Sequence, residues 1–170
     1  MKLEIPEPLR LREEAICTAL RRAAETGGGT GEAAELLEVI LLPHLEKENV
    51  DVLQPLGLLS RLARGEVTPE MAELLPQINQ LASDLRNLRV EHATILSAIK
   101  RLVAAAREEG KSRQVRFAQR LVFRAWLDES IFHPLAILIG KYLQLRLPPG
   151  TTFANVPSSL GKRVEFDLPE

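Results

Sequence analysis

Residues 85–103, LRNLRVEHATILSAIKRLV, contain the pattern that decides the fold. Apolar side chains recur there with the period of about 3.6 residues that marks one face of an α-helix. The apolar residues of this face are Leu85, Leu88, Ile95, Leu96, Ile99 and Val103. A histidine, His92, lies at the centre of the same face. The stretch therefore predicts an amphipathic helix that turns one imidazole toward the protein core.

Three other segments show the same period, and helix breakers separate them. We expect helices over residues 8–26, 30–48, 68–109 and 112–132, with an irregular helical connection over 49–65. Thr30 and Thr68 are the expected N-caps. Pro43 should kink the second helix, and Pro134 should disturb the end of the fourth. Strand signals are nearly absent, so we predict an all-α, up-down four-helix bundle over residues 1–146 and an irregular tail over 147–170.

Composition excludes several classes of protein. The chain has 170 residues, of which 45% are hydrophobic, and this is enough for one packed domain. Its net charge of −1 gives no global attraction to nucleic acid or to an anionic membrane. The first residues lack the apolar core of a signal peptide, and the single cysteine, Cys17, allows no intrachain disulfide. We therefore expect a cytoplasmic protein without nucleic-acid or membrane partners.

Polar residues fall on the apolar face of every expected helix. His44 and Glu48 are one turn apart in the second helix, Glu13 lies in the first, His92 in the third and Glu129 in the fourth. Buried carboxylates that share one cavity repel one another and need a cation. By helical period, no lysine or arginine lies on these faces to pair with them. Histidine and carboxylate together suit iron, with manganese or zinc as alternatives, so these five residues are the predicted metal ligands.

These residues resemble the hemerythrin-like, or HHE cation-binding, family. The segment Leu41–Glu48 is similar to that family's His-x-x-x-Glu helix with its preceding proline. Val90-Glu91-His92 resembles the third helix, and residues 126–135 resemble the fourth. The likeness spans about residues 8–146. It implies a hemerythrin-like bundle with one or two non-haem iron ions, His44, Glu48, His92 and Glu129 at ligand positions, and a role in binding oxygen or nitric oxide, in redox sensing or in metal handling.

Two positions depart from the family pattern. Glu13 stands where the first helix of the family offers a histidine, and Ala125 stands where the fourth helix does. Asp128 or His133 could compensate, although neither occupies a family position. The site could therefore hold one metal ion, hold two with extra waters, or be vestigial.

Other functions remain open at this point. The bundle could have lost its metal and serve as an interaction or regulatory domain, with an acidic protein partner on the row formed by Arg113, Arg116, Arg120 and Arg124. By default such a row is simply solvated. A di-metal oxidase is a weaker hypothesis because no substrate pocket can be named, so a non-enzyme is favoured. Residues 27–31, rich in glycine, are interpreted as a flexible connection rather than as an anion site.

Overall fold

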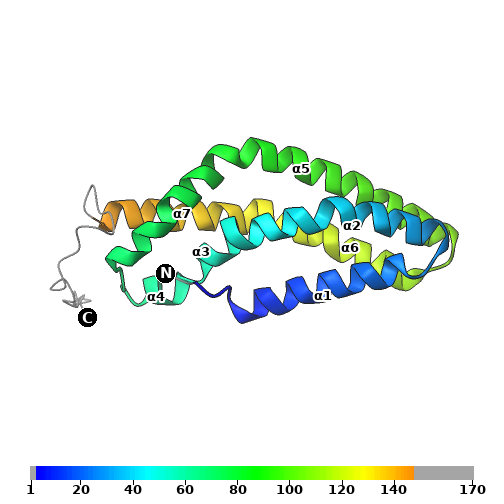
Figure 1. Cartoon of the computed structure of the whole chain (residues 1–170), viewed down its shortest axis with the longest axis horizontal. Coiled ribbons are helices and arrows are strands. Elements are labelled where there is room, and N and C mark those ends of the chain that lie inside the picture. Colours follow the sequence, from blue (N-terminus) through cyan, green and yellow to red (C-terminus); the bar gives the residue numbers. More distant parts are fainter. Residues whose placement is uncertain (1–2, 148–170) are drawn as a thin grey trace, which may run out of the picture.

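The computed structural model describes residues 3–147, and within this range the chain is helical with no strand. Four long helical rods lie side by side, and Figure 1 shows a longer connection between the second and the third. In chain order the elements are α1 (Glu7–Ala24), α2 (Gly28–Glu48), the π-helical turn η1 (Asn49–Leu53), α3 (Gln54–Leu56), α4 (Leu59–Ala63), the 3-10 helix η2 (Pro69–Leu74), α5 (Leu75–Glu108), α6 (Ser112–Leu127), the π-helical turn η3 (Asp128–Phe132) and α7 (His133–Arg146). The all-α prediction is confirmed.

The expected helices correspond to these rods with local differences. α2 begins at Gly28, with Gly27 as its N-cap, and Thr30 lies inside its first turn. The third expected helix starts as η2 before α5, and Pro76 lies in the first turn of α5. The fourth does not stop at Phe132 but continues through η3 into α7. The predicted irregular tail lies outside the described residues apart from Leu147, which follows α7.

The start of α2 receives a carboxylate from the far end of α5. Glu109 accepts hydrogen bonds from the backbone nitrogen of Gly29 (2.6 Å) and from the hydroxyl of Thr30 (2.7 Å). Free N–H groups and the helix dipole favour a negative charge at a helix N-terminus. The glycine-rich connection is thus fixed against the α5–α6 turn by an anion of the chain itself.

The apolar core is divided into two clusters. One lies among α1, α2, α5 and α6 and includes Leu41, Ile95 and Leu121. The other lies among η1, α3, α5 and α7 and includes Val52 and Leu88. Where the two clusters meet, α2 buries His44 and Glu48 and α5 buries His92. The bundle therefore encloses a polar layer across its middle.

Two prolines shape the rods at this layer. Pro55 and Pro134 each lie in the first turn of the helix that follows a π-helical turn: Pro55 in α3 after η1, and Pro134 in α7 after η3. Proline has no N–H and its ring clashes with the carbonyl of residue i−4, which disturbs a regular α-helix. A π-turn, in which hydrogen bonds run from i to i+5, accommodates the proline and rotates the rest of the helix about its axis. α2 nevertheless continues as an α-helix through Pro43 as far as Glu48.

None of the described helices is long and apolar enough to cross a membrane.

Candidate metal centre

Three imidazoles converge on one oxygen atom of Glu48 in the polar layer. The Oε1 atom of Glu48 lies 2.8 Å from His133 Nε2, and 3.3 Å from both His44 Nε2 and His92 Nε2. The Nε2 atoms of His44 and His92 are 2.8 Å apart. All four side chains are buried. We call His44, Glu48, His92 and His133 the histidine site; its members come from α2, α5 and α7.

Two further carboxylates, which we call the outer carboxylates, contact the Nδ1 atoms of His44 and His92. His44 Nδ1 lies 2.9 Å from Glu91 Oε2, and His92 Nδ1 lies 2.8 Å from Glu129 Oε1. An ionised carboxylate only accepts, so each Nδ1 carries the hydrogen that it donates. In neutral rings, both Nε2 atoms then turn lone pairs toward each other. A proton or a metal ion between them relieves this repulsion, and carboxylates on the far nitrogen are the usual partners of metal-binding histidines.

A buried arginine lies directly beside the histidine site. Arg124 Nε donates to Glu13 Oε1 at 2.9 Å, and Arg124 Nη1 donates to Glu48 Oε2 at 2.9 Å and to Asp128. Arg124 is only 5% exposed. We call these four residues the arginine cluster. Glu48 belongs to both groups, since Oε1 faces the imidazoles and Oε2 faces the guanidinium.

Arg124 corrects two inferences from the sequence. The expectation that no basic residue reaches the core faces is wrong, and Arg124 does not belong to the solvent-facing row, whose other members, Arg113, Arg116 and Arg120, are exposed. Position 124 lies next to the buried Ala125 and one turn before the buried Asp128. From there the long, flexible side chain reaches inward to three carboxylates, which a helical wheel based on Cα positions does not reveal.

The electrostatics of the site keep Glu48 ionised. Burial raises the pKa of Glu48, but hydrogen bonds from His133, His44 and His92 outweigh it and hold this pKa well below its usual value. Burial lowers the pKa of His92, but its contacts with Glu48 and Glu129 outweigh burial and raise it. The raised pKa of His92 favours a proton on this imidazole beside the ionised Glu48.

The pKa values of Asp128 and Arg124 are both raised, which favours the neutral form of Asp128 and the charged form of Arg124. Burial, followed by the charge of Glu48, raises the pKa of Asp128 to about 7. Burial acts to lower the pKa of Arg124, but the charges of Glu48, Asp128 and Glu13 raise it further above its usual value. The arginine cluster thus contains a permanent cation and one carboxyl group that gains or loses a proton near neutral pH.

The predicted ligands take three different places. His44, Glu48 and His92 lie together, with one ligand atom of each within 4.8 Å of the others, and this group could hold a metal ion. Glu129 contacts the outer nitrogen of His92 and its side chain is 40% exposed. Glu13 contacts Arg124 instead. Ala125 is buried and offers no ligand atom.

His133 and Asp128 take a larger part in the site than the helical period indicated. In a continuous α-helix, residues five apart differ by about 140° around the axis, so these two should not share a face. The π-turn η3 spans the five residues 128–132 and brings both into the core, at 1% and 3% exposure for Asp128 and His133. Pro134 was the signal for this change of register.

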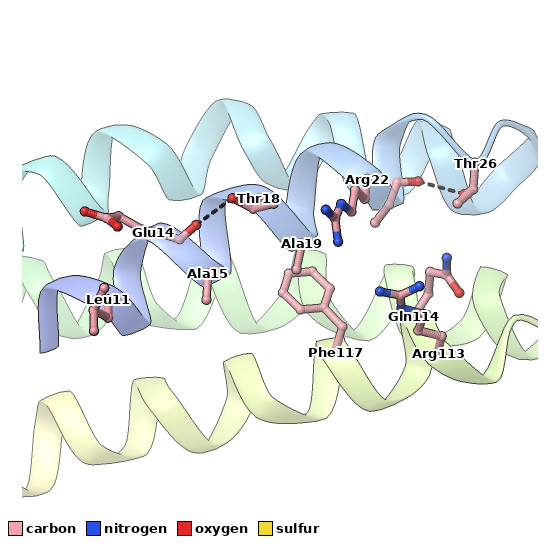
Figure 2. Close-up of a pocket in the computed structure, with 11 residues that line it drawn as sticks. Leu11, Glu14, Ala15, Thr18, Ala19, Arg22, Thr26, Arg113, Gln114 and Phe117 are labelled. Atoms are coloured by element: carbon pink, nitrogen blue, oxygen red, sulfur yellow. Dashed lines mark hydrogen bonds between the residues drawn. The ribbon is translucent and has the colours of Figure 1, made fainter. Parts of the chain in front are cut away.

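Surface pockets lead to two edges of the site. One, between α2 and α5, is lined by His44 together with Pro43, Lys47 and Glu91. Another, between α5 and α7, is lined by His133 and Glu129. By contrast, the hollow between α1 and α6 in Figure 2, where Phe117 lies near Ala19, contains no residue of the histidine site.

Comparison with known proteins finds no matching family model, no matching curated protein and no matching solved structure. Fold and site together define an all-α protein with a buried histidine–glutamate group that could hold a metal ion.

Proposed function

We propose that this protein binds a transition-metal ion, with iron the foremost candidate, at the histidine site. The observation that carries this proposal is the pair of Nε2 atoms of His44 and His92, 2.8 Å apart beside a carboxylate oxygen of Glu48. Two imidazoles and one carboxylate with open positions are the ligand set of many non-haem Fe(II) centres. Manganese and zinc also bind imidazole or carboxylate ligands, but this set of three ligands is less characteristic of them.

The chain's own residues prepare this site. Glu91 and Glu129 fix the tautomer and the orientation of the two rings, while Arg124 holds the second oxygen of Glu48. His133 Nε2 lies 2.8 Å from Glu48 Oε1, which makes His133 a candidate for a further ligand. A bound ion would supply a Lewis acid with free coordination positions.

We further propose a hemerythrin-like role for the site: binding of oxygen or nitric oxide, redox sensing or metal handling. The order of the ligands along the second, third and fourth long rods supports this likeness. The pockets at His44 and His133 are suitable routes for a small ligand. No larger substrate is implied.

Metal analysis after growth with added iron tests the proposal. We expect about one ion per chain and an absorption spectrum of non-haem iron, because the ligands are already convergent. The variant His92→Ala should lose this metal. Gln80→Ala, an exposed change on the same helix, should retain it. Far substoichiometric metal in the unchanged protein would contradict the proposal.

A second candidate function is an interaction domain that keeps the fold without metal. On α6 the rings of Phe123 and Trp126 stack with centroids 5.7 Å apart, although both side chains are more than half exposed. Arg116 and Arg120 continue this face by helical spacing. Exposed aromatic and arginine side chains are enriched in protein interfaces. An acidic protein surface is the partner that this face would fit.

Thermal unfolding with and without chelator separates the two candidates. Binding to the native state raises stability by RT ln(1 + [L]/Kd), about 2.7 kcal/mol at a hundredfold excess over Kd. An unfolding midpoint that changes with neither metal nor chelator favours the interaction domain. A midpoint that rises with iron favours the metal-binding protein.

A further inference from the structure

We infer that the guanidinium of Arg124 takes the place of a second cation, so that the centre holds one metal ion and gains another only when this arginine is removed. The inference rests on the proposed function and deepens it by setting the number of ions. It starts from the shared carboxylate, because Glu48 faces the imidazoles with one oxygen and Arg124 with the other.

The arginine cluster has the donors of a cation site. Glu13 comes from α1, Glu48 from α2 and Asp128 from η3, and each directs an oxygen to Arg124. In centres with two metal ions, carboxylates from facing helices bridge or flank the pair. Here the three carboxylates surround the guanidinium of Arg124 instead of a second metal ion.

Charge repulsion disfavours a second metal ion beside Arg124. The guanidinium already contacts Glu13, Glu48 and Asp128 and is the cation of this cluster. A guanidinium and a second metal ion cannot both occupy the space within reach of Glu13, Glu48 and Asp128 without repulsion.

A buried carboxylate oxygen without a hydrogen-bond partner is a second, independent sign of a cation site at the arginine cluster. Glu13 is 6% exposed, and its Oε2 has no hydrogen-bond partner among the described residues; the same is true of Arg124 Nη2. A buried carboxylate oxygen without a partner is costly. It is a free ligand atom for an ion once the guanidinium is gone.

The test compares metal stoichiometry by native mass spectrometry with Co²⁺ or Fe²⁺ as the probe. Arg124→Met keeps an unbranched apolar chain and should bind one ion more than the unchanged protein. The matched control, Arg120→Met, removes an exposed arginine one turn earlier on α6 and should change nothing. Adding Glu13→Gln to Arg124→Met should return the count to that of the unchanged protein.

Each outcome decides the inference. An unchanged protein with two ions overturns it, and so does an Arg124→Met variant with no additional ion. If the unchanged protein binds none and Arg124→Met binds one, the proposed function and the count of one ion both fail. Only the replacement of a cation by the guanidinium is then supported, provided that adding Glu13→Gln removes the ion again. If Arg124→Met folds only with metal, gain of the additional ion on refolding still supports it. The variant with Glu13→Gln and Asp128→Asn added then restores folding without metal, because the buried charges are gone.

Discussion

The Nε2 atoms of His44 and His92 face each other at 2.8 Å, on rings whose Nδ1 atoms are each held by a carboxylate. The rings meet almost edge to face, at an interplanar angle of 68°. This relationship leaves a lone pair on each side of a short gap, and a cation is the natural occupant. A change in the groups that hold the rings should therefore change the affinity for that cation.

Loss of either outer carboxylate should weaken metal binding. Glu91→Gln and Glu129→Gln keep an oxygen near His44 and His92 but remove the charge that raises ligand basicity. Such partners typically contribute about 10–100-fold in metal affinity. Competition with a coloured chelator measures the change, and Glu46→Gln, an exposed carboxylate on α2, serves as the control. Equal affinities in all three variants would show that the outer carboxylates do not act on the rings.

Removal of Glu13 should destabilise the bundle through Arg124. Glu13→Ala leaves Arg124 Nε without its acceptor in the core, and a lost hydrogen bond to a charged group costs on the order of 2 kcal/mol. Urea denaturation measures this as a change in the free energy of unfolding. The neighbouring Glu14 is exposed and pairs with Arg10, so Glu14→Ala should cost less than about 0.5 kcal/mol. Similar losses for the two variants would mean that Glu13 is not buried against the guanidinium.

Replacement of Pro134 should misplace His133. In Pro134→Ala the backbone N–H returns, and η3 can relax toward a regular α-helix that turns His133 away from Glu48. We expect unchanged helix content by circular dichroism and a metal affinity lower by about tenfold or more, as for other losses around a ligand set. Wild-type affinity in this variant would show that the π-turn does not depend on the proline or that His133 does not take part.

The cap on α2 predicts a particular pH dependence of stability. Contacts with Lys111, and then with Thr30, lower the pKa of Glu109 to about 2. A carboxylate whose pKa is lower in the folded state stabilises it above the unfolded pKa of about 4.3, and loses this contribution as the pH falls toward 2. Glu109→Gln should therefore melt at a lower temperature near neutral pH, and the difference from the unchanged protein should shrink between about pH 4 and pH 2. A difference that is constant with pH would exclude the charge of Glu109 as its source.

The helical period of the sequence was sufficient to find the bundle and part of the site. His44, Glu48 and His92 lie at the centre of regular apolar faces, so their burial is expected directly from their position. Glu91 was missed as a partner because it lies about 100° around the helix from His92 and reaches His44 across the interface with α2.

The places of Arg124 and His133 in the site could not be predicted from a helical wheel. Arg124 starts at the margin of the buried face of α6 and reaches inward because its side chain is long and three carboxylates attract it. His133 enters the core because η3 changes the register after Leu127. Arg124 is therefore buried because its side chain is long, and His133 is buried because of the π-turn before Pro134. Neither position follows from the apolar period.

The most direct test of the metal-binding account is a crystal structure of protein prepared with iron, with anomalous data on both sides of the iron absorption edge. The account predicts one anomalous peak per chain, within coordination distance of His44 Nε2, His92 Nε2 and Glu48 Oε1. Well-ordered histidines with no peak between them would contradict it, as would a peak only at some other place on the chain.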